Sequence, residues 1–174
     1  MKWILETERF RLREFHPDDA AVKYHLNADP EVIQYTGNKP FASIEETRSF
    51  LERYEDYQKN GFGRWWCVSK SSDEIVGWCG LKREDGEVDV GYRFFKKYWG
   101  QGIATETAKA CVEFGFRSLN IDRIVGRALK ANPASIRVLE KIGLLYWKEE
   151  WIEDLGACEV WALNNPYLDK SSNL

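Results

Sequence analysis

Residues 96–116, which are KKYWGQGIATETAKACVEFGF, contain two glycines one residue apart at the start of a helical pattern. A glycine inside a helix costs about 1 kcal/mol relative to alanine. No Ser, Asp or Asn stands before Ile103 to cap the first turn, so the backbone N–H groups there are left free. Free N–H groups at a helix N-terminus favour an anion, usually a phosphate. A plain tight turn would also explain Gly100 and Gly102.

Two other phosphate-binding motifs fit this stretch poorly. A P-loop needs Lys-Ser or Lys-Thr at a fixed spacing, and neither follows here. The third glycine of the Rossmann fingerprint would fall at Thr105. The fingerprint also needs an acidic residue at the end of the next strand to bind the ribose, but Asp122 stands at the start of that predicted strand. The predicted helix has a narrow face of small residues that can lie close against a sheet. This face consists of Ala104, Ala108, Cys111, Val112 and Gly115.

The composition indicates one globular domain. The chain has 174 residues and 44% hydrophobic content, which suits one core, and we expect a single domain over residues 1–168 with a polar tail at 169–174. A net charge of −3 and a pI near 5.6 argue against nucleic-acid binding. No stretch is apolar enough for a signal peptide or a membrane span, so we expect a cytoplasmic protein that binds no membrane.

Cysteine and histidine usage argues against metal and disulfide chemistry. The cysteines are irregularly spaced, form no CxxC pair and are predicted to be reduced core residues. They are Cys67, Cys79, Cys111 and Cys158. With two histidines, His16 and His25, a histidine triad or zinc site has little to draw on, and we expect no metal.

Sequence periodicity predicts the element order βααβββαβαββ, a mixed α/β (α+β) chain. The strands are predicted at 9–15, 63–70, 74–82, 87–95, 123–129, 145–151 and 157–163. The helices are predicted at 16–29, 47–60, within 96–116 and at 132–143. Ser43 and Glu46 form a capping box ahead of the second helix. The strands from 63 to 95 should form an antiparallel meander, and the last two a hairpin.

Two of these stretches together resemble the GNAT superfamily of acyl-CoA N-acyltransferases. They are DVGYRFF followed by YWGQGIATETAKA, and NPASIRVLEKIG about thirty residues later. The similarity is greatest to the branch containing the ribosomal-protein N-terminal acetyltransferases and many small-amine acetyltransferases, and it covers nearly the whole chain. The resemblance implies a mostly antiparallel mixed sheet of about seven strands with four flanking helices. It also implies a V-shaped split between the fourth and fifth strands and acetyl-CoA as cosubstrate.

The resemblance also assigns cofactor contacts. It places the CoA pyrophosphate on the backbone N–H groups of Gly100, Gln101, Gly102, Ile103, Ala104 and Thr105. The pantetheine arm would bond to free backbone around Arg93 and Phe94 and to Asn132, and Ser135 would face the sulfur. Asn132, Pro133 and Gly143 also have a purely structural explanation, because they start and end a helix well. The chain departs from the family at Trp99, where Arg or Gln is common, and at Leu139, where many relatives have a tyrosine general acid.

The candidate general bases are Glu87 and Asp89, which point to the same side of their strand. The family has an acidic residue near this register, and Asp89 matches its pattern best. Exposed carboxylates on an acidic hairpin are the alternative, and Glu149 and Glu150 are weaker candidates. Acidic residues crowd positions 84–89 and 149–159, which favours a cationic substrate if both segments lie near the acceptor, although solvated loops give the same pattern.

These observations predict an N-acetyltransferase that moves an acetyl group from acetyl-CoA to a primary amine such as a protein N-terminus. One alternative is an enzyme for a small-molecule amine, namely a polyamine, amino acid or antibiotic. The other is a non-catalytic acyl-CoA-binding module, suggested by Leu139 at the tyrosine position. The sequence gives no signal for the oligomeric state.

Overall fold

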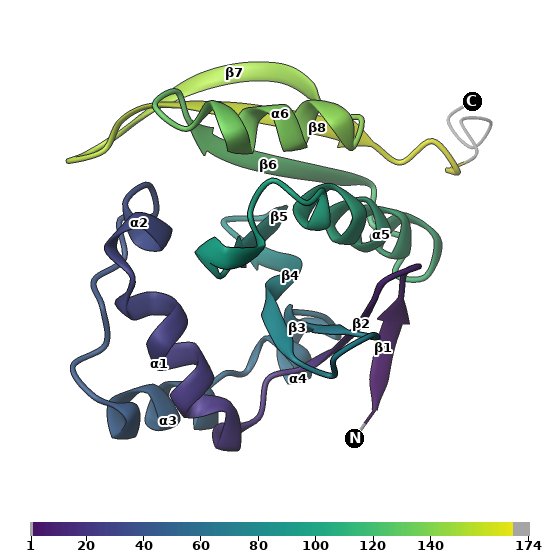
Figure 1. Ribbon diagram of the computed structural model, residues 1–174. Coiled ribbons are helices and arrows are strands. Elements are labelled where there is room, and N and C mark those ends of the chain that lie inside the picture. Colours follow the sequence, from purple (N-terminus) through teal and green to yellow (C-terminus); the bar gives the residue numbers. More distant parts are fainter. Residues whose placement is uncertain (1, 169–174) are drawn as a thin grey trace.

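The computed structural model describes residues 2–168, whose strands form a single sheet of eight strands (Figure 1). The sheet order is β1-β2-β3-β4-β5-β6-β8-β7, and every neighbouring pair is antiparallel except β5 and β6. The strands are β1 Trp3–Glu6, β2 Phe10–Glu14, β3 Arg64–Ser69, β4 Ile75–Glu84, β5 Glu87–Phe94, β6 Arg123–Leu129, β7 Leu145–Ile152 and β8 Gly156–Asn164. The predicted meander and the closing hairpin are both confirmed.

The sheet splits between β5 and β6. These parallel strands share one register pair, Asp89 with Val125, whereas β4 and β5 pair continuously from Gly77 to Glu87. In Figure 1, β6, β7 and β8 form an upper part with α6 (Pro133–Lys141), and β1 to β5 form the lower part. The predicted V-shaped split between the fourth and fifth predicted strands is therefore confirmed.

Helices cover both faces of the sheet. Neighbouring tryptophans on β3 show the two layers, because Trp65 packs in the core beneath α5 and Trp66 in the core beneath α1 and α2. Both indoles are fully buried. The helical segments are η1 Pro17–Asp19, α1 Ala20–Ala28, α2 Pro30–Ile33, α3 Ile44–Glu52, α4 Asp56–Asn60, η2 Lys96–Tyr98, α5 Ile103–Arg117 and α6.

Two elements differ from the sequence prediction. The N-terminal strand β1 was not expected; four residues are too short to show a clear period, and β1 depends on pairing with β2 and on Arg11 stacking over Trp3 at 4.6 Å. The helix predicted at 47–60 is two helices, α3 and α4. Tyr54, in the break, and Tyr57, in α4, both hydrogen-bond to the backbone of Arg64.

Smaller predictions are largely confirmed. Ser43 Oγ caps α3 by accepting from the N–H of Glu46 at 3.1 Å, although Glu46 itself reaches the N–H of Ala42. The cysteines are free and buried. The small face of α5 is buried except for Ala104, which lies half-buried in the first turn. Within residues 2–168 no helix could span a membrane, and the predicted tail at 169–174 lies outside the described residues.

Candidate active site

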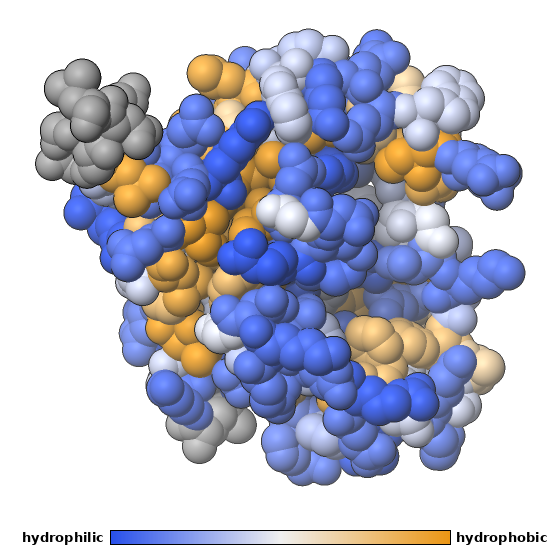
Figure 2. Space-filling view, turned by 180° about the vertical axis from the view of Figure 1, so that it is seen from behind, coloured by the Kyte–Doolittle hydropathy of each residue, from blue (hydrophilic) through white to orange (hydrophobic). Residues whose placement is uncertain are grey.

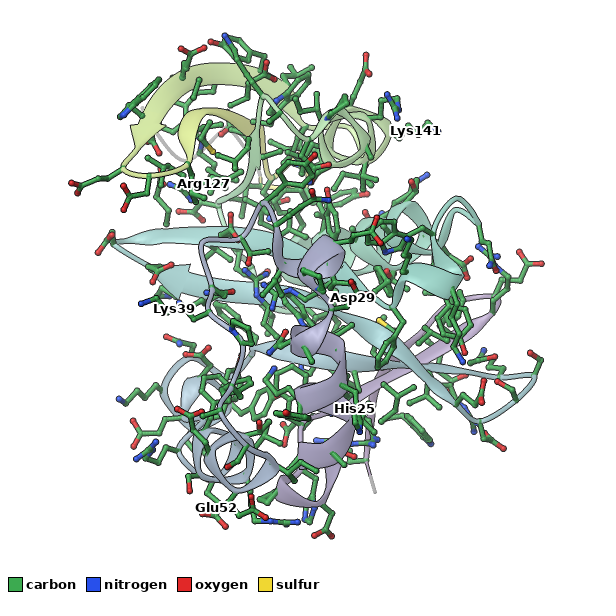
Figure 3. All side chains as sticks on the ribbon, turned by 60° about the vertical axis from the view of Figure 1, so that its left-hand side comes forward. His25, Asp29, Lys39, Glu52, Arg127 and Lys141 are labelled. Atoms are coloured by element: carbon green, nitrogen blue, oxygen red, sulfur yellow. The ribbon has the colours of Figure 1, made fainter. Side chains whose placement is uncertain are left out.

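A cleft of about 1230 Å³ lies at the split between β5 and β6. From behind, the surface is hollowed at the right between the upper and lower parts of the molecule (Figure 2). Arg127 and Lys141 both line the cleft, and Figure 3 shows Arg127 at the left, below the upper strands, and Lys141 at the right, beside α6. All of the predicted site residues except Gln101 line it. The fold therefore brings together residues spread from position 87 to position 135.

The start of α5 has the geometry of an anion site. Gly100 and Gly102 have φ of 73° and 74°, a left-handed conformation that side chains rarely adopt, and no side chain caps the helix. The first intrahelical N–H is that of Glu106, which bonds to Gly102. Within residues 2–168, the N–H groups of Ile103, Ala104 and Thr105 therefore have no partner. A Cβ at Gly100 would meet no atom within 4 Å, so the approach to these groups is open.

Two side chains, to which the sequence assigned no role, hold this turn. Trp99 Nε1 donates to the carbonyl of Phe94 at 2.9 Å and ties the turn to the end of β5. Arg9 donates to the carbonyl of Gln101 at 3.0 Å and pairs with Glu106 at 2.6 Å. Trp99 is one of the two positions at which the sequence departs from the pattern it resembles, and its indole supplies an anchor there.

The alternation of β5 puts two chemistries on opposite faces of the strand. Glu87, Asp89 and Arg93 face the side of α1 and α2, whereas Tyr92 faces α5 and α6. Beyond Asp89, the edge of β5 that faces β6 pairs with no strand of the described chain. Backbone groups at Arg93 and Phe94 thus border the cleft.

The predicted bases lie in a network of ion pairs. Arg64 Nη2 contacts Asp89 Oδ1 at 2.7 Å, and Arg127 Nη1 lies 3.6 Å from Asp89 Oδ2. Arg127 also pairs with Glu87 and, at 3.5 Å, with Glu150. Burial raises the pKa of Asp89, and the two guanidinium groups offset part of this rise. Asp89 is therefore held in one orientation with a carboxylate more basic than usual.

Hydroxyl groups occupy the other face. The Tyr92 hydroxyl lies 2.9 Å from Ser135 Oγ and donates to the Ser135 carbonyl at 3.0 Å. Burial raises the pKa of Tyr92, so the phenol stays protonated. Asn132 Oδ1 caps α6 through the N–H of Ser135 at 3.2 Å. Leu139 is buried in the core, so the phenol in this region comes from β5 instead of α6.

Sequence reasoning missed Tyr92, Arg64 and Arg127. The orientation of Tyr92 could have been predicted from the sequence. In DVGYRFF it lies an odd number of residues from Asp89, so its side chain points to the opposite face of the strand. Arg64 and Arg127 lie on β3 and β6, and no local pattern connects them with β5.

These features fit the groups of CoA. Free N–H groups at the start of a fifteen-residue helix suit a pyrophosphate, and the unpaired edge of β5 suits an extended amide-containing arm. The amide nitrogen of Asn132 makes no hydrogen bond within residues 2–168 and remains available to such an arm.

Comparisons with known proteins agree with this geometry. The family model described as "Acetyltransferase (GNAT) domain" matches residues 9–145. The uncharacterized N-acetyltransferase p20 of Bacillus licheniformis is 32% identical over 154 residues, which cover 86% of this chain and 85% of that protein. An acetyltransferase (GNAT family) structure from Bacillus anthracis has a TM-score of 0.80 at 23% identity and covers 92% of this chain and 98% of that one. RimL, a ribosomal L7/L12 alpha-N-protein acetyltransferase in complex with coenzyme A, has a TM-score of 0.80 at 17% identity, with 94% and 98% covered. The chain belongs to the GNAT family and is an acetyl-CoA-dependent N-acetyltransferase.

Proposed function

We propose that this enzyme acetylates a primary amine, and that the acceptor is an α-amine such as a protein N-terminus. One observation carries the proposal: the carboxylates of Glu87 and Asp89 and the hydroxyl pair of Tyr92 and Ser135 lie on opposite faces of β5 beside the split. Transfer from a thioester needs a proton acceptor near the amine nitrogen and a proton donor near the sulfur. The two faces supply one each.

The cofactor contacts in this proposal come from backbone and one amide. The N–H groups of Ile103, Ala104 and Thr105 would hold the pyrophosphate, and the free edge of β5 at Arg93 and Phe94 would hold the pantetheine arm. Acetyl-CoA supplies the activated acyl group when it is bound. An N–H on the same free edge can donate to the acetyl oxygen, an interaction worth about 2.7–4 kcal/mol in other enzymes.

The chain's own groups account for the protons. As the bond from the amine nitrogen to the acetyl carbon forms and the carbon–sulfur bond breaks, Asp89 accepts the proton from nitrogen. Ser135 Oγ can donate a proton to the departing thiolate and regain one from solvent, and the Tyr92 hydroxyl at 2.9 Å holds Ser135 Oγ in place. Glu87, paired with Arg127, is the second candidate for the base.

The strength of the base favours an α-amine. An α-amine has a pKa of about 8 and is roughly one-tenth neutral at pH 7, whereas a lysine or polyamine amine, with a pKa of about 10.4, is almost entirely protonated. Asp89 is paired with Arg64 and so is at most a moderate base. The fold-level likeness to RimL, which is named as an alpha-N-protein acetyltransferase, supports the same choice.

Release of free CoA thiol from acetyl-CoA tests the proposal against a panel of N-terminal peptides, lysine, polyamines and aminoglycosides. We expect the highest kcat/KM for the peptides. A clear preference for a polyamine or an aminoglycoside would move the enzyme to the small-molecule class. Tight CoA binding without amine-dependent release would identify a non-catalytic module.

A further inference from the structure

The acidic residues at the acceptor side of the cleft are largely neutralised. Of the carboxylates that line the cleft near β5, Glu87, Asp89 and Glu150 pair with Arg127 or Arg64, and Glu150 also with Lys148 at 2.6 Å. Glu84 pairs with Lys82 at 2.8 Å, whereas Asp85, at the turn between β4 and β5, lines the cleft without an ion pair among the described residues. The acidic runs in the sequence therefore do not leave a strongly negative acceptor site. The acidic runs at 84–89 and 149–159 are therefore only weak evidence for a cationic substrate.

Two cations in the same region lack a carboxylate partner. Lys23 on α1 is 6% exposed, and its Nζ lies among aromatic rings, 4.2 Å from the ring centre of Phe15 and 6.0 Å from that of Trp78. Within residues 2–168 it has neither a hydrogen bond nor an ion pair. Arg93 bonds to the neutral amides of Asn27 and Asn38, and its Nε has no partner. A buried cation without an anion is costly, so such a pair needs an explanation.

These groups converge on one indole. Arg93 pairs with Trp78 across β4 and β5, and its guanidinium lies 5.4 Å from the ring centre. Asn27, to which Arg93 donates, lies one helical turn after Lys23 on the same face of α1. Trp78 Nε1 is buried and has no acceptor among the described residues. Lys23 Nζ, Trp78 Nε1 and Arg93 Nε are therefore neighbouring N–H donors that no acceptor among the described residues serves.

The surrounding charges do not balance this cluster. Glu31, which lines the cleft, pairs with Lys96, and the Asp29 carboxylate caps α2 through the N–H of Glu31 at 2.9 Å. In Figure 3, α1 and α2 run in front of the strands with Asp29 between them. Burial and the neighbouring guanidinium groups of Arg93 and Arg64 lower the pKa of Lys23 to about 7. Burial is the larger cause of this lower pKa, and the two guanidinium groups add to it because no carboxylate pairs with Lys23 among the described residues.

We propose that the cluster formed by Lys23, Trp78 and Arg93 binds an anionic group of the acceptor, so that the preferred acceptor is a primary amine that also carries a carboxylate. The inference rests on the proposed function and specifies its substrate class. Arg93 and Trp78 line the cleft on the face that carries Asp89. Arg93 follows Asp89 by four strand residues, about 13 Å along β5. This separation suits a carboxylate several bonds from the amine, such as an acidic side chain near a peptide N-terminus.

Matched peptides test the charge preference. They share an N-terminal alanine and hold aspartate, asparagine or lysine at the second and third positions; free aspartate and glutamate form a second arm that separates amino acids from peptides. A charge-assisted hydrogen bond contributes enough to give about a 10- to 100-fold preference in kcat/KM for the aspartate peptide over the asparagine peptide. In Lys23→Met and Arg93→Met this ratio should fall to about 1–3. The control Arg53→Met removes an exposed charge on the C-cap of α3 and should keep the ratio.

A binding measurement separates this inference from the proposed function. Calorimetry with the CoA-loaded protein and the aspartate peptide should show binding in the wild type that weakens at least tenfold in Lys23→Met. Because Lys23 has no polar partner, methionine should not impair folding, whereas Arg93→Met could. Binding without any turnover would support the cluster and refute the proposed function. Equal turnover of aspartate and asparagine peptides, or a preference for lysine peptides or polyamines, would overturn the inference and leave acetyl transfer intact.

Discussion

Replacing Lys23 with methionine should stabilise the protein at pH 7 and have little effect at pH 10. The pKa of Lys23 is lowered from 10.5 to about 7 by burial, then by Arg93 and Arg64. At a pH between about 7 and 10.5, Lys23 is protonated in the unfolded chain but largely neutral in the folded protein. The free energy of unfolding therefore rises with pH in this range, by up to about 1.4 kcal/mol per pH unit. The penalty is fully present below the folded pKa and disappears as pH rises through the unfolded pKa.

The pKa difference alone corresponds to a penalty of about 4 kcal/mol at pH 7 and about 1 kcal/mol at pH 10. Attraction between the ammonium and nearby rings, including Phe15 and Trp66, favours the charged form and offsets part of this penalty. We therefore expect Lys23→Met to raise the free energy of unfolding by about 2–4 kcal/mol at pH 7. The methionine thioether fills a similar volume against the same rings.

Urea unfolding of the wild type and Lys23→Met at pH 7 and pH 10 measures this difference in the free energy of unfolding. The other titrating groups contribute equally to both proteins, so their contributions cancel. Lys109→Met, at an exposed position on α5, is the control and should change little at either pH. A stability difference that is the same at both pH values would show that Lys23 keeps an ordinary pKa. A less stable Lys23→Met at both values would show that the ammonium makes a favourable polar contact.

Three further predictions concern the candidate site. Gly102→Val should abolish CoA binding measured by calorimetry, whereas Gly61→Val, at a similar φ of 76°, should cost only stability; a Cβ would meet no atom within 4 Å at Gly61 and only Arg9, at 3.7 Å, at Gly102, and equal CoA affinity in both variants would remove the phosphate assignment. Asp89→Asn should lower kcat most at neutral pH and recover in part at high pH, where the amine deprotonates unaided; a loss independent of pH would indicate positioning. Ser135→Ala should lower kcat by about 10²-fold with little change in the KM for acetyl-CoA, and Tyr92→Phe should do the same more weakly; a change confined to KM would make both residues cofactor contacts.

The sequence was sufficient for most of the fold because its signals are local. Alternation marked each of the longer strands, and the glycines at 100 and 102 marked the start of α5. The missed strand β1 has four residues and is defined by its partner β2. The break between α3 and α4 depends on the backbone of Arg64, to which Tyr54 and Tyr57 bond. Contacts of this kind leave no local trace in a sequence.

The same distinction applies to the site. The backbone turn at Gly102 and the cap at Asn132 could be predicted, because each is defined by residues adjacent in the chain. The net charge of the proposed acceptor region could not be predicted from the sequence. Counting acids along the chain gave a negative region, but Arg64 and Arg127 reach those acids from other strands. Only the fold shows which charges remain unpaired.

The period of β5 has a consequence for how acceptor choice can change in such an enzyme. Positions 87, 89, 91 and 93 face the side of α1 and α2, where the proposed function places the acceptor, and positions 92 and 94 face α5 and α6. At Gly91 a Cβ would lie 2.7 Å from the Arg64 guanidinium, so the glycine leaves room for the arginine that holds Asp89. A substitution at an odd position therefore alters charge around the amine and leaves the hydroxyl pair of Tyr92 and Ser135 in place. An insertion of one residue would exchange the two faces and remove both functions together. Substitution at the odd positions is thus a route by which the acceptor can change while the use of acetyl-CoA is retained.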